Sequence, residues 1–170
     1  GLGRLAACYM ESMATLGISG FGYGIRYESG LFKQSIEKGW QVEEPDDWTS
    51  GGSFWEFPRS EVHYDIGFMG TTRQRDKAVT WTPGETVEAM ANDFPIIGWQ
   101  GKSAATLRLW SARSKAPLNM SAFDQGDYLG AYRPKIMAEA ISQVLYPNDS
   151  TEQGKRLRLS QEYFFSAASI

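Results

Sequence analysis

The first seventeen residues, GLGRLAACYMESMATLG, combine two early glycines with the pattern of an amphipathic helix. Apolar side chains recur at helical spacing from Leu5 to Leu16. Gly17 follows the last of them, where a glycine commonly ends a helix in the left-handed conformation. The stretch therefore predicts a helix that starts directly after a glycine loop and ends at Gly17.

The glycine loop is itself a candidate ligand site, formed by Gly1, Leu2 and Gly3. The first N–H groups of a helix have no partner within it, and the helix dipole makes that end positive. Glycine leaves the backbone open to close approach, so an anion or a sugar hydroxyl could reach these N–H groups. The competing interpretation is a plain turn, which is the commoner use of glycine ahead of a helix.

Alternating apolar and polar residues predict strands through the first two thirds of the chain. A helix followed by a strand is typical of an α/β sheet, to which the later strands would add an antiparallel part. Pro83-Gly84 predicts a hairpin between the two segments that flank it, and Glu43–Trp48 is expected to form an acidic loop. The predicted strands are Phe21–Tyr27, Phe32–Ile36, Val62–Phe68, Ala78–Trp81, Thr86–Ala91 and Leu107–Ala112.

Helical patterns fill the last third of the chain. Apolar residues from Ile136 to Leu145 form a stripe with i, i+4 spacing that stops before Pro147. Ser150 followed by Gln153 is a candidate capping box for a final helix. The apolar face of this helix would carry Leu157, Gln161, Phe164 and Ala168.

The composition indicates a globular protein with a sizeable core and excludes a strongly basic binding surface. The 170 residues are 42% hydrophobic and carry a formal net charge of −3, which favours neither nucleic acid nor an anionic membrane as partner. No apolar run reaches membrane-spanning length. The single cysteine, Cys8, is expected to be a buried small hydrophobic residue in a cytosolic protein.

Long blocks of the sequence resemble the α-glucan phosphorylases, the family of glycogen, starch and maltodextrin phosphorylases. The longest block is residues 1–48, GLGRLAACYMESMATLGISGFGYGIRYESGLFKQSIEKGWQVEEPDDW. The resemblance returns at Thr106–Ala112, Val144–Asp149, Leu157–Leu159 and Gln161–Phe164. Because there is no initiator Met and the start falls within a family motif, we expect an internal fragment of a longer enzyme.

The resemblance implies a Rossmann-like α/β fold. Residues 1–170 would be a single partial domain of the N-terminal lobe of a two-lobed GT-B glycosyltransferase, with an antiparallel β insertion and C-terminal helices. The implied reaction is the reversible phosphorolysis of terminal α-1,4-linked glucose, with an α-glucan and inorganic phosphate as substrates and glucose 1-phosphate as product. The family's cofactor, pyridoxal phosphate, would be held by a lysine of the other lobe, so this chain alone is expected to be inactive.

The resemblance also implies two groups of site residues. Gly1, Leu2 and Gly3 would offer backbone N–H groups to phosphate and sugar, and Asp149 would lie near the glucosyl unit. Ser150 stands where the family often has asparagine, and its hydroxyl has a shorter reach and one donor in place of two. From the residues alone, this turn is better explained by helix punctuation, and it is the resemblance that favours a sugar-binding role.

The segment Gly126–Tyr146 resembles the family's helix that projects from one subunit and packs on its dimer partner. We therefore expect it to lie at a homodimer interface. Pro134 interrupts it, because a proline within a helix removes a hydrogen bond and clashes with the preceding turn. The alternatives are a kinked helix and a helix that begins with Pro134 at its first position, and the apolar stripe from Ile136 favours the second.

Several other residues invite a functional interpretation that we set against a structural one. His63 could act as an acid or base, but it lies in a strand pattern without a neighbouring carboxylate or serine, so we predict a structural role. The carboxylates Glu43, Glu44, Asp46 and Asp47 resemble a metal or glycosidase pair, yet such runs are usually solvated, and no metal site is predicted.

The six tryptophans support an alternative function of a different class, a non-catalytic carbohydrate-binding module. Aromatic platforms bind sugars, but most of these residues alternate within strand patterns, which favours packing. The tryptophans are Trp40, Trp48, Trp55, Trp81, Trp99 and Trp110.

Overall fold

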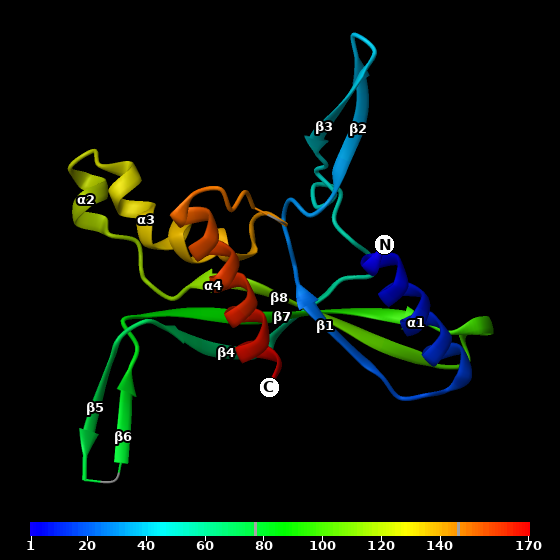
Figure 1. The fold of residues 1–170 in the computed structure, drawn as a ribbon, viewed down its shortest axis with the longest axis horizontal. Coiled ribbons are helices and arrows are strands. Elements are labelled where there is room, and N and C mark those ends of the chain that lie inside the picture. Colours follow the sequence, from blue (N-terminus) through cyan, green and yellow to red (C-terminus); the bar gives the residue numbers. More distant parts are fainter. Residues whose placement is uncertain (77, 146) are drawn as a thin grey trace.

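A four-stranded mixed sheet forms the centre of the computed structural model, which describes residues 1–76, 78–145 and 147–170 (Figure 1). Its strand order is β1-β8-β7-β4. β1 runs parallel to β8, whereas β8 with β7 and β7 with β4 are antiparallel, which confirms an α/β sheet with an antiparallel part. The strands are β1 (Phe21–Ile25), β4 (Phe57–Phe68), β7 (Glu85–Ile97) and β8 (Ala104–Ser114).

Two separate hairpins project from the sheet in different directions (Figure 1). The first joins β2 (Phe32–Glu37) to β3 (Trp40–Pro45), and the second joins β5 (Thr71–Arg75) to β6 (Ala78–Thr82). Both are exposed along most of their length.

The predicted hairpin around Pro83-Gly84 is wrong, because the segments on its two sides do not pair. β6 pairs with β5, whereas β7 pairs with β4 and β8. The turn was located correctly, and the Gly84 N–H donates to the carbonyl of Phe68 at 3.0 Å. The partner of β7 is set by burial instead, since Val87 lies opposite Ile66 within the core.

The predicted acidic loop is wrong in its first half. Glu43, Glu44 and Pro45 belong to β3, where Glu43 lies opposite Gln34 and Glu44 opposite Lys33. Backbone pairing with β2 explains the extended conformation, and both glutamates remain exposed.

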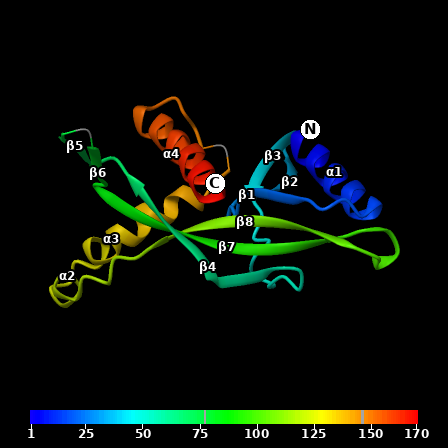
Figure 2. The same ribbon diagram turned by 90° about the horizontal axis from the view of Figure 1, so that it is seen from below.

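The helices are α1 (Leu2–Leu16), α2 (Met120–Asp124), α3 (Tyr128–Glu139) and α4 (Glu152–Ser169). Short 3-10 turns follow β7 at Trp99–Gly101 and α3 at Ala140–Ser142. Figure 2 shows α1 and α4 above β7 and β8 of the four-stranded sheet. Gly17 ends α1 with a φ of 69°, as predicted. No helix within residues 1–76, 78–145 and 147–170 combines the length and apolar character needed to cross a bilayer.

The prediction that a helix begins at Pro134 is wrong, since Pro134 lies inside α3. The start is set by Asp127, whose side chain accepts a hydrogen bond from the Gly130 N–H at 2.9 Å and caps the first turn. The regular helix ends at Glu139 and does not continue through Val144. The predicted segment ends at Tyr146, which lies outside the described residues.

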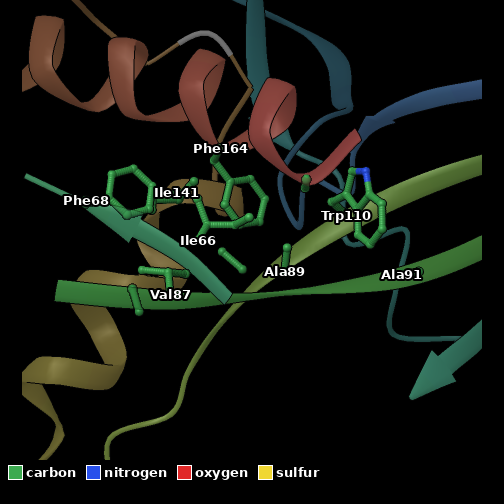
Figure 3. Close-up of a cluster of buried hydrophobic side chains, with 11 residues drawn as sticks. Ile66, Phe68, Val87, Ala89, Ala91, Trp110, Ile141 and Phe164 are labelled. Carbon is green, nitrogen blue, oxygen red and sulfur yellow. The ribbon is translucent and has the colours of Figure 1, made fainter. Parts of the chain in front are cut away.

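Two apolar clusters hold the helices on the sheet. Figure 3 shows the larger one, in which Phe164 points from α4 toward the strands beside Ile141 and Ile66. Trp110 of β8 is only 1% exposed and completes this core. The buried members of this cluster are Ile66, Phe68, Val87, Ala89, Ala91, Trp110, Ala112, Ala138, Ile141, Phe164 and Ala168.

The second cluster joins α1 to the sheet through Met10, Ala14 and Ala105. It also shows why the expected burial of Cys8 is wrong, since this residue is exposed. Cys8 precedes Met10 by two residues, a rotation of about 200° around the helix, so it points away from the sheet.

The connection between β7 and β8 is hydrogen-bonded to the C-terminal end of α1. The Trp99 N–H donates to Thr15 Oγ1 at 3.0 Å, and the Ser103 hydroxyl donates to the Ala14 carbonyl. Gly98 allows this approach, because a Cβ there would lie 2.6 Å from the carbonyl carbon and oxygen of Ala14.

Gly98→Ala is expected to loosen α1 from the sheet. The added methyl group forces the helix or the connection to shift, at a cost of about 1–3 kcal/mol. Amide hydrogen exchange within α1 measures the effect as faster exchange. Gly51→Ala is the control, since a Cβ there meets nothing within 4 Å; equal protection of α1 in the two variants would contradict the predicted contact.

Candidate functional site

The glycine segment forms the start of α1 instead of a loop ahead of it. Gly1 is the N-cap, Leu2 and Gly3 lie in the first turn, and the Leu5 N–H donates to the Gly1 carbonyl at 3.1 Å. All three N-terminal residues are exposed, and a Cβ at Gly1 or Gly3 would meet no atom within 4 Å. The described part of the chain therefore gives no packing reason for glycine there, and it leaves the backbone open to a ligand.

The second candidate group lies in the turn that leads into α4. The Asp149 carboxylate is about half exposed and accepts a hydrogen bond from Arg158 at 2.6 Å. The Ser150 N–H donates to Asn148 Oδ1 at 2.8 Å, which closes the turn, and the Ser150 side chain is exposed. Both predicted residues are therefore accessible to a ligand.

The start of α4 fixes this turn through its backbone. The helix is capped by Thr151, whose hydroxyl accepts from the Gly154 N–H at 3.1 Å, so the predicted capping box at Ser150 and Gln153 is wrong. Gly154 also allows close packing, because a Cβ there would lie 1.8 Å from the Asn148 carbonyl oxygen. Any larger residue must push the turn away from the helix.

The two candidate groups do not converge within this chain. Gly1, Leu2 and Gly3 lie at the start of α1, whereas Asp149 and Ser150 lie just before the start of α4. These two helix ends lie apart in both ribbon views (Figures 1 and 2). If both groups bind one ligand, other parts of the protein must complete the site between them.

A polar cavity of about 550 Å³ was not anticipated from the sequence. At its edge, Arg26 is bound by Glu56 on one side and by Glu28 at 2.6 Å on the other, and it lies over the ring of Trp48. The hydrogen bond that Arg26 donates to the Glu56 carboxylate is the largest cause of a raised Arg26 pKa. The alternating pattern that begins at Phe21 continues at Arg26 and Glu28 in the sequence, although β1 itself ends at Ile25. No local pattern indicates Glu56, thirty residues after Arg26.

A second ion pair crosses the centre of the sheet. Arg108 of β8 donates to both oxygens of Asp93 on β7, at 2.7 and 2.9 Å, and the two residues are direct partners in the strand register. These hydrogen bonds lower the pKa of Asp93. The Arg108 guanidinium also lies over the ring of Trp110, which links the pair to the core.

His63 lies in a strand, as predicted, and its structural role stays a prediction. It lies in β4 next to a register shift, is exposed, and its Nδ1 is 3.0 Å from the Ser60 carbonyl. Within the described parts of the chain, His, Cys, Asp and Glu side chains form no group of three suited to hold a metal ion.

The expectation that the tryptophans pack in the core is correct for Trp110 and wrong for four others. Trp48 is partly buried and donates to the Glu28 carbonyl at 3.0 Å. The exposed residues occupy β3, β6, the segment before β4 and the β7–β8 connection, which extend away from the core. They are Trp40, Trp55, Trp81 and Trp99.

Fold and sites together define a mixed α/β domain whose candidate ligand groups lie at two helix N-termini. The family model for carbohydrate phosphorylases matches residues 1–170, so the chain belongs to that family. It is 51% identical over all of its residues to a glycogen phosphorylase of Pasteurella multocida. It is 48% identical to the liver form of glycogen phosphorylase from Bos taurus and to the brain form from Homo sapiens. The chain spans about a fifth of the length of these relatives.

Asp93→Asn is expected to weaken the sheet at neutral pH by roughly 1.5–3 kcal/mol, because hydrogen bonds to a charged partner are lost. The Asp93 pKa is lowered in the folded state, so its stabilisation is complete above its ordinary value of 3.8 and is lost as the pH falls below it. The difference in unfolding midpoint between wild type and variant should therefore shrink below about pH 4. A difference that stays constant into acid would contradict the assignment.

Proposed function

We propose that this chain is part of a glycogen phosphorylase, an enzyme that cleaves terminal α-1,4-linked glucose with inorganic phosphate and releases glucose 1-phosphate. The observation that carries the proposal is the 48–51% identity, over the whole chain, to relatives that bear this name.

In this proposal residues 1–170 form one partial domain of the N-terminal lobe of a two-lobed glycosyltransferase. The separation of the two candidate groups supports this two-lobed arrangement. Within this chain the two groups do not form a closed site, so a second lobe is needed to complete it. A parallel strand pair with helices packed on the sheet, as in β1 and β8, is also compatible with a Rossmann-like lobe.

The candidate residues take distinct roles. Gly1, Leu2 and Gly3 offer the unpaired N–H groups of the first turn of α1 to phosphate and sugar oxygens, aided by the helix dipole. The Asp149 carboxylate stabilises the positive charge that develops on the glucosyl unit in an oxocarbenium-like transition state. The Ser150 hydroxyl pairs with a sugar hydroxyl.

Pyridoxal phosphate belongs, in this proposal, to the other lobe. A lysine that holds it as a Schiff base needs an enclosed pocket and a lowered pKa, and the residues present do not fit this requirement. The lysines that the structure describes are exposed, and three of them are paired with carboxylates: Lys115 with Asp65, Lys135 with Glu139 and Lys155 with Glu152. The chain alone is accordingly expected to bind no cofactor and to catalyse no phosphorolysis.

The alternative of a carbohydrate-binding module is less well supported by the exposed aromatic residues. A sugar platform needs several aromatic rings on one surface. Trp40 and Trp81 lie on the two hairpins that project in different directions (Figure 1). Trp99 lies in the 3-10 turn at the start of the β7–β8 connection.

A homodimer is the proposed assembly of the full-length enzyme, and the exposed apolar surface of α2 and α3 supports it. Leu129 is 79% exposed, and Met137 lies two turns further along the same helix. Soluble proteins seldom leave such a surface uncovered. Its apolar members are Met120, Tyr128, Leu129, Tyr132, Ile136 and Met137.

Asp149→Asn in the full-length enzyme is expected to lower kcat by ~10²-fold or more, with a smaller effect on KM for glucose 1-phosphate. The carboxylate stabilises charge that is present in the transition state and absent in the ground state. Steady-state kinetics in the direction of glucan synthesis measure both constants. Wild-type kcat in this variant would contradict transition-state stabilisation by Asp149 and leave the residue with a role in the turn only.

Leu129→Asp together with Met137→Asp is expected to convert the full-length dimer to monomers, because two charges would be buried at the interface. Sedimentation velocity at micromolar concentration provides the measurement. Lys135→Ala, on the same helix, serves as the control and should remain dimeric. A monomeric wild-type enzyme would refute the proposed assembly.

A further inference from the structure

The Asp149 carboxylate needs a support that its own turn does not supply. The hydrogen bond from the Ser150 N–H to the Asn148 side chain closes the backbone around Asp149, but it does not direct the carboxylate. The side chain of Asp149 is 54% exposed. An exposed aspartate is free to rotate unless another side chain holds it.

Arg158 supplies such a support from α4. Its Nη1 donates to Asp149 Oδ2 at 2.6 Å, a short distance typical of a charge-assisted hydrogen bond. The residue belongs to a helix that is anchored in the core through Phe164 and Ala168. The guanidinium therefore extends from a fixed element toward an exposed turn.

The same helix holds the chain around the turn at two further points. Gln161 is buried, and its amide donates to the carbonyls of Ile141 and Val144 at 3.0 and 2.9 Å. Gly154 permits the close approach of Asn148. These two contacts act on the backbone, whereas Arg158 acts on the carboxylate itself.

Arg158 also lines a cavity of about 300 Å³ between α4 and the C-terminal end of β1. Gly24, Ile25 and Phe165 form apolar parts of its wall, and Glu162 contributes a carboxylate. In α/β sheets, ligands commonly bind beyond the C-terminal ends of parallel strands. Arg158 thus borders a space of the kind in which a small ligand could lie, and it reaches Asp149 from there.

We propose that Arg158 is a positioning residue, which holds the Asp149 carboxylate in the orientation that the reaction requires. The inference rests on the proposed function of Asp149. A positioning role predicts a large effect on the rate and a small effect on stability, which distinguishes it from a purely structural role. An exposed ion pair contributes little to stability, but a misplaced reacting group can slow an enzyme by about a hundredfold.

The test compares Arg158→Gln, Arg158→Lys, Asp149→Asn and the double variant Arg158→Gln/Asp149→Asn in the full-length enzyme. Lys155→Gln is the matched control, because Lys155 makes an exposed ion pair with Glu152 at 2.7 Å on the same helix. Each protein is assayed for kcat, for KM with glucose 1-phosphate, and for its melting temperature.

Arg158→Gln is expected to lower kcat by roughly tenfold or more, with little change in KM, and to melt at the same temperature as Lys155→Gln. Arg158→Lys should recover part of kcat, since it keeps a charged donor but loses the planar guanidinium. The double variant should be no slower than Asp149→Asn, because the two residues act as one unit.

Four results would overturn the inference. Wild-type kcat in Arg158→Gln, while Asp149→Asn is slow, would remove the role of Arg158 and leave the proposed function of Asp149 intact. Additive losses in the double variant would mean that Arg158 acts independently of Asp149. If Arg158→Gln fails to fold, wild-type kcat in Arg158→Lys would exclude a need for the guanidinium geometry. Wild-type kcat in Asp149→Asn would instead overturn the proposed function, and this inference with it.

Discussion

The burial of Phe164 and Trp110 between α4 and the sheet is the constraint on which the rest of this structure depends. Phe164 is fully buried, and the Trp110 Nε1–H donates to the Ser169 hydroxyl at 3.1 Å, so α4 is tied to β8 near its C-terminal end. Deleting a buried aromatic ring costs about 3–5 kcal/mol, which exceeds any single polar contact described above. The position of α4 then fixes what its polar face can reach.

Because α4 is fixed on the sheet, its polar side chains also fix the turn that carries Asp149. Arg158 and Gln161 lie three residues apart, a spacing that places both on one side of the helix. The amide of Gln161 donates to two backbone carbonyls, and that of the buried Ile141 would otherwise be costly to leave without a partner. A candidate site that is largely exposed is thus given its geometry by a core to which it contributes no side chain.

Periodicity located most elements but not their partners. The alternation around Phe21, Val62 and Leu107 correctly predicted three strands, because burial of one face leaves a local signature in the sequence. The partner of β7 and the interior position of Pro134 were missed. Strand pairing depends on which distant apolar faces meet, and the start of α3 depends on the cap at Asp127.

The sequence by itself determined the family, through long blocks that include residues 1–48, and it determined the helix end at Gly17, because a left-handed cap is a local requirement. It also singled out Asp149 as a candidate through the resemblance. Only the tertiary structure decided that Arg158 holds this carboxylate and that Glu56 binds Arg26. The physical reason is that ion pairs depend on distances between side chains, and those distances are set only when α4 and the strands pack around the core.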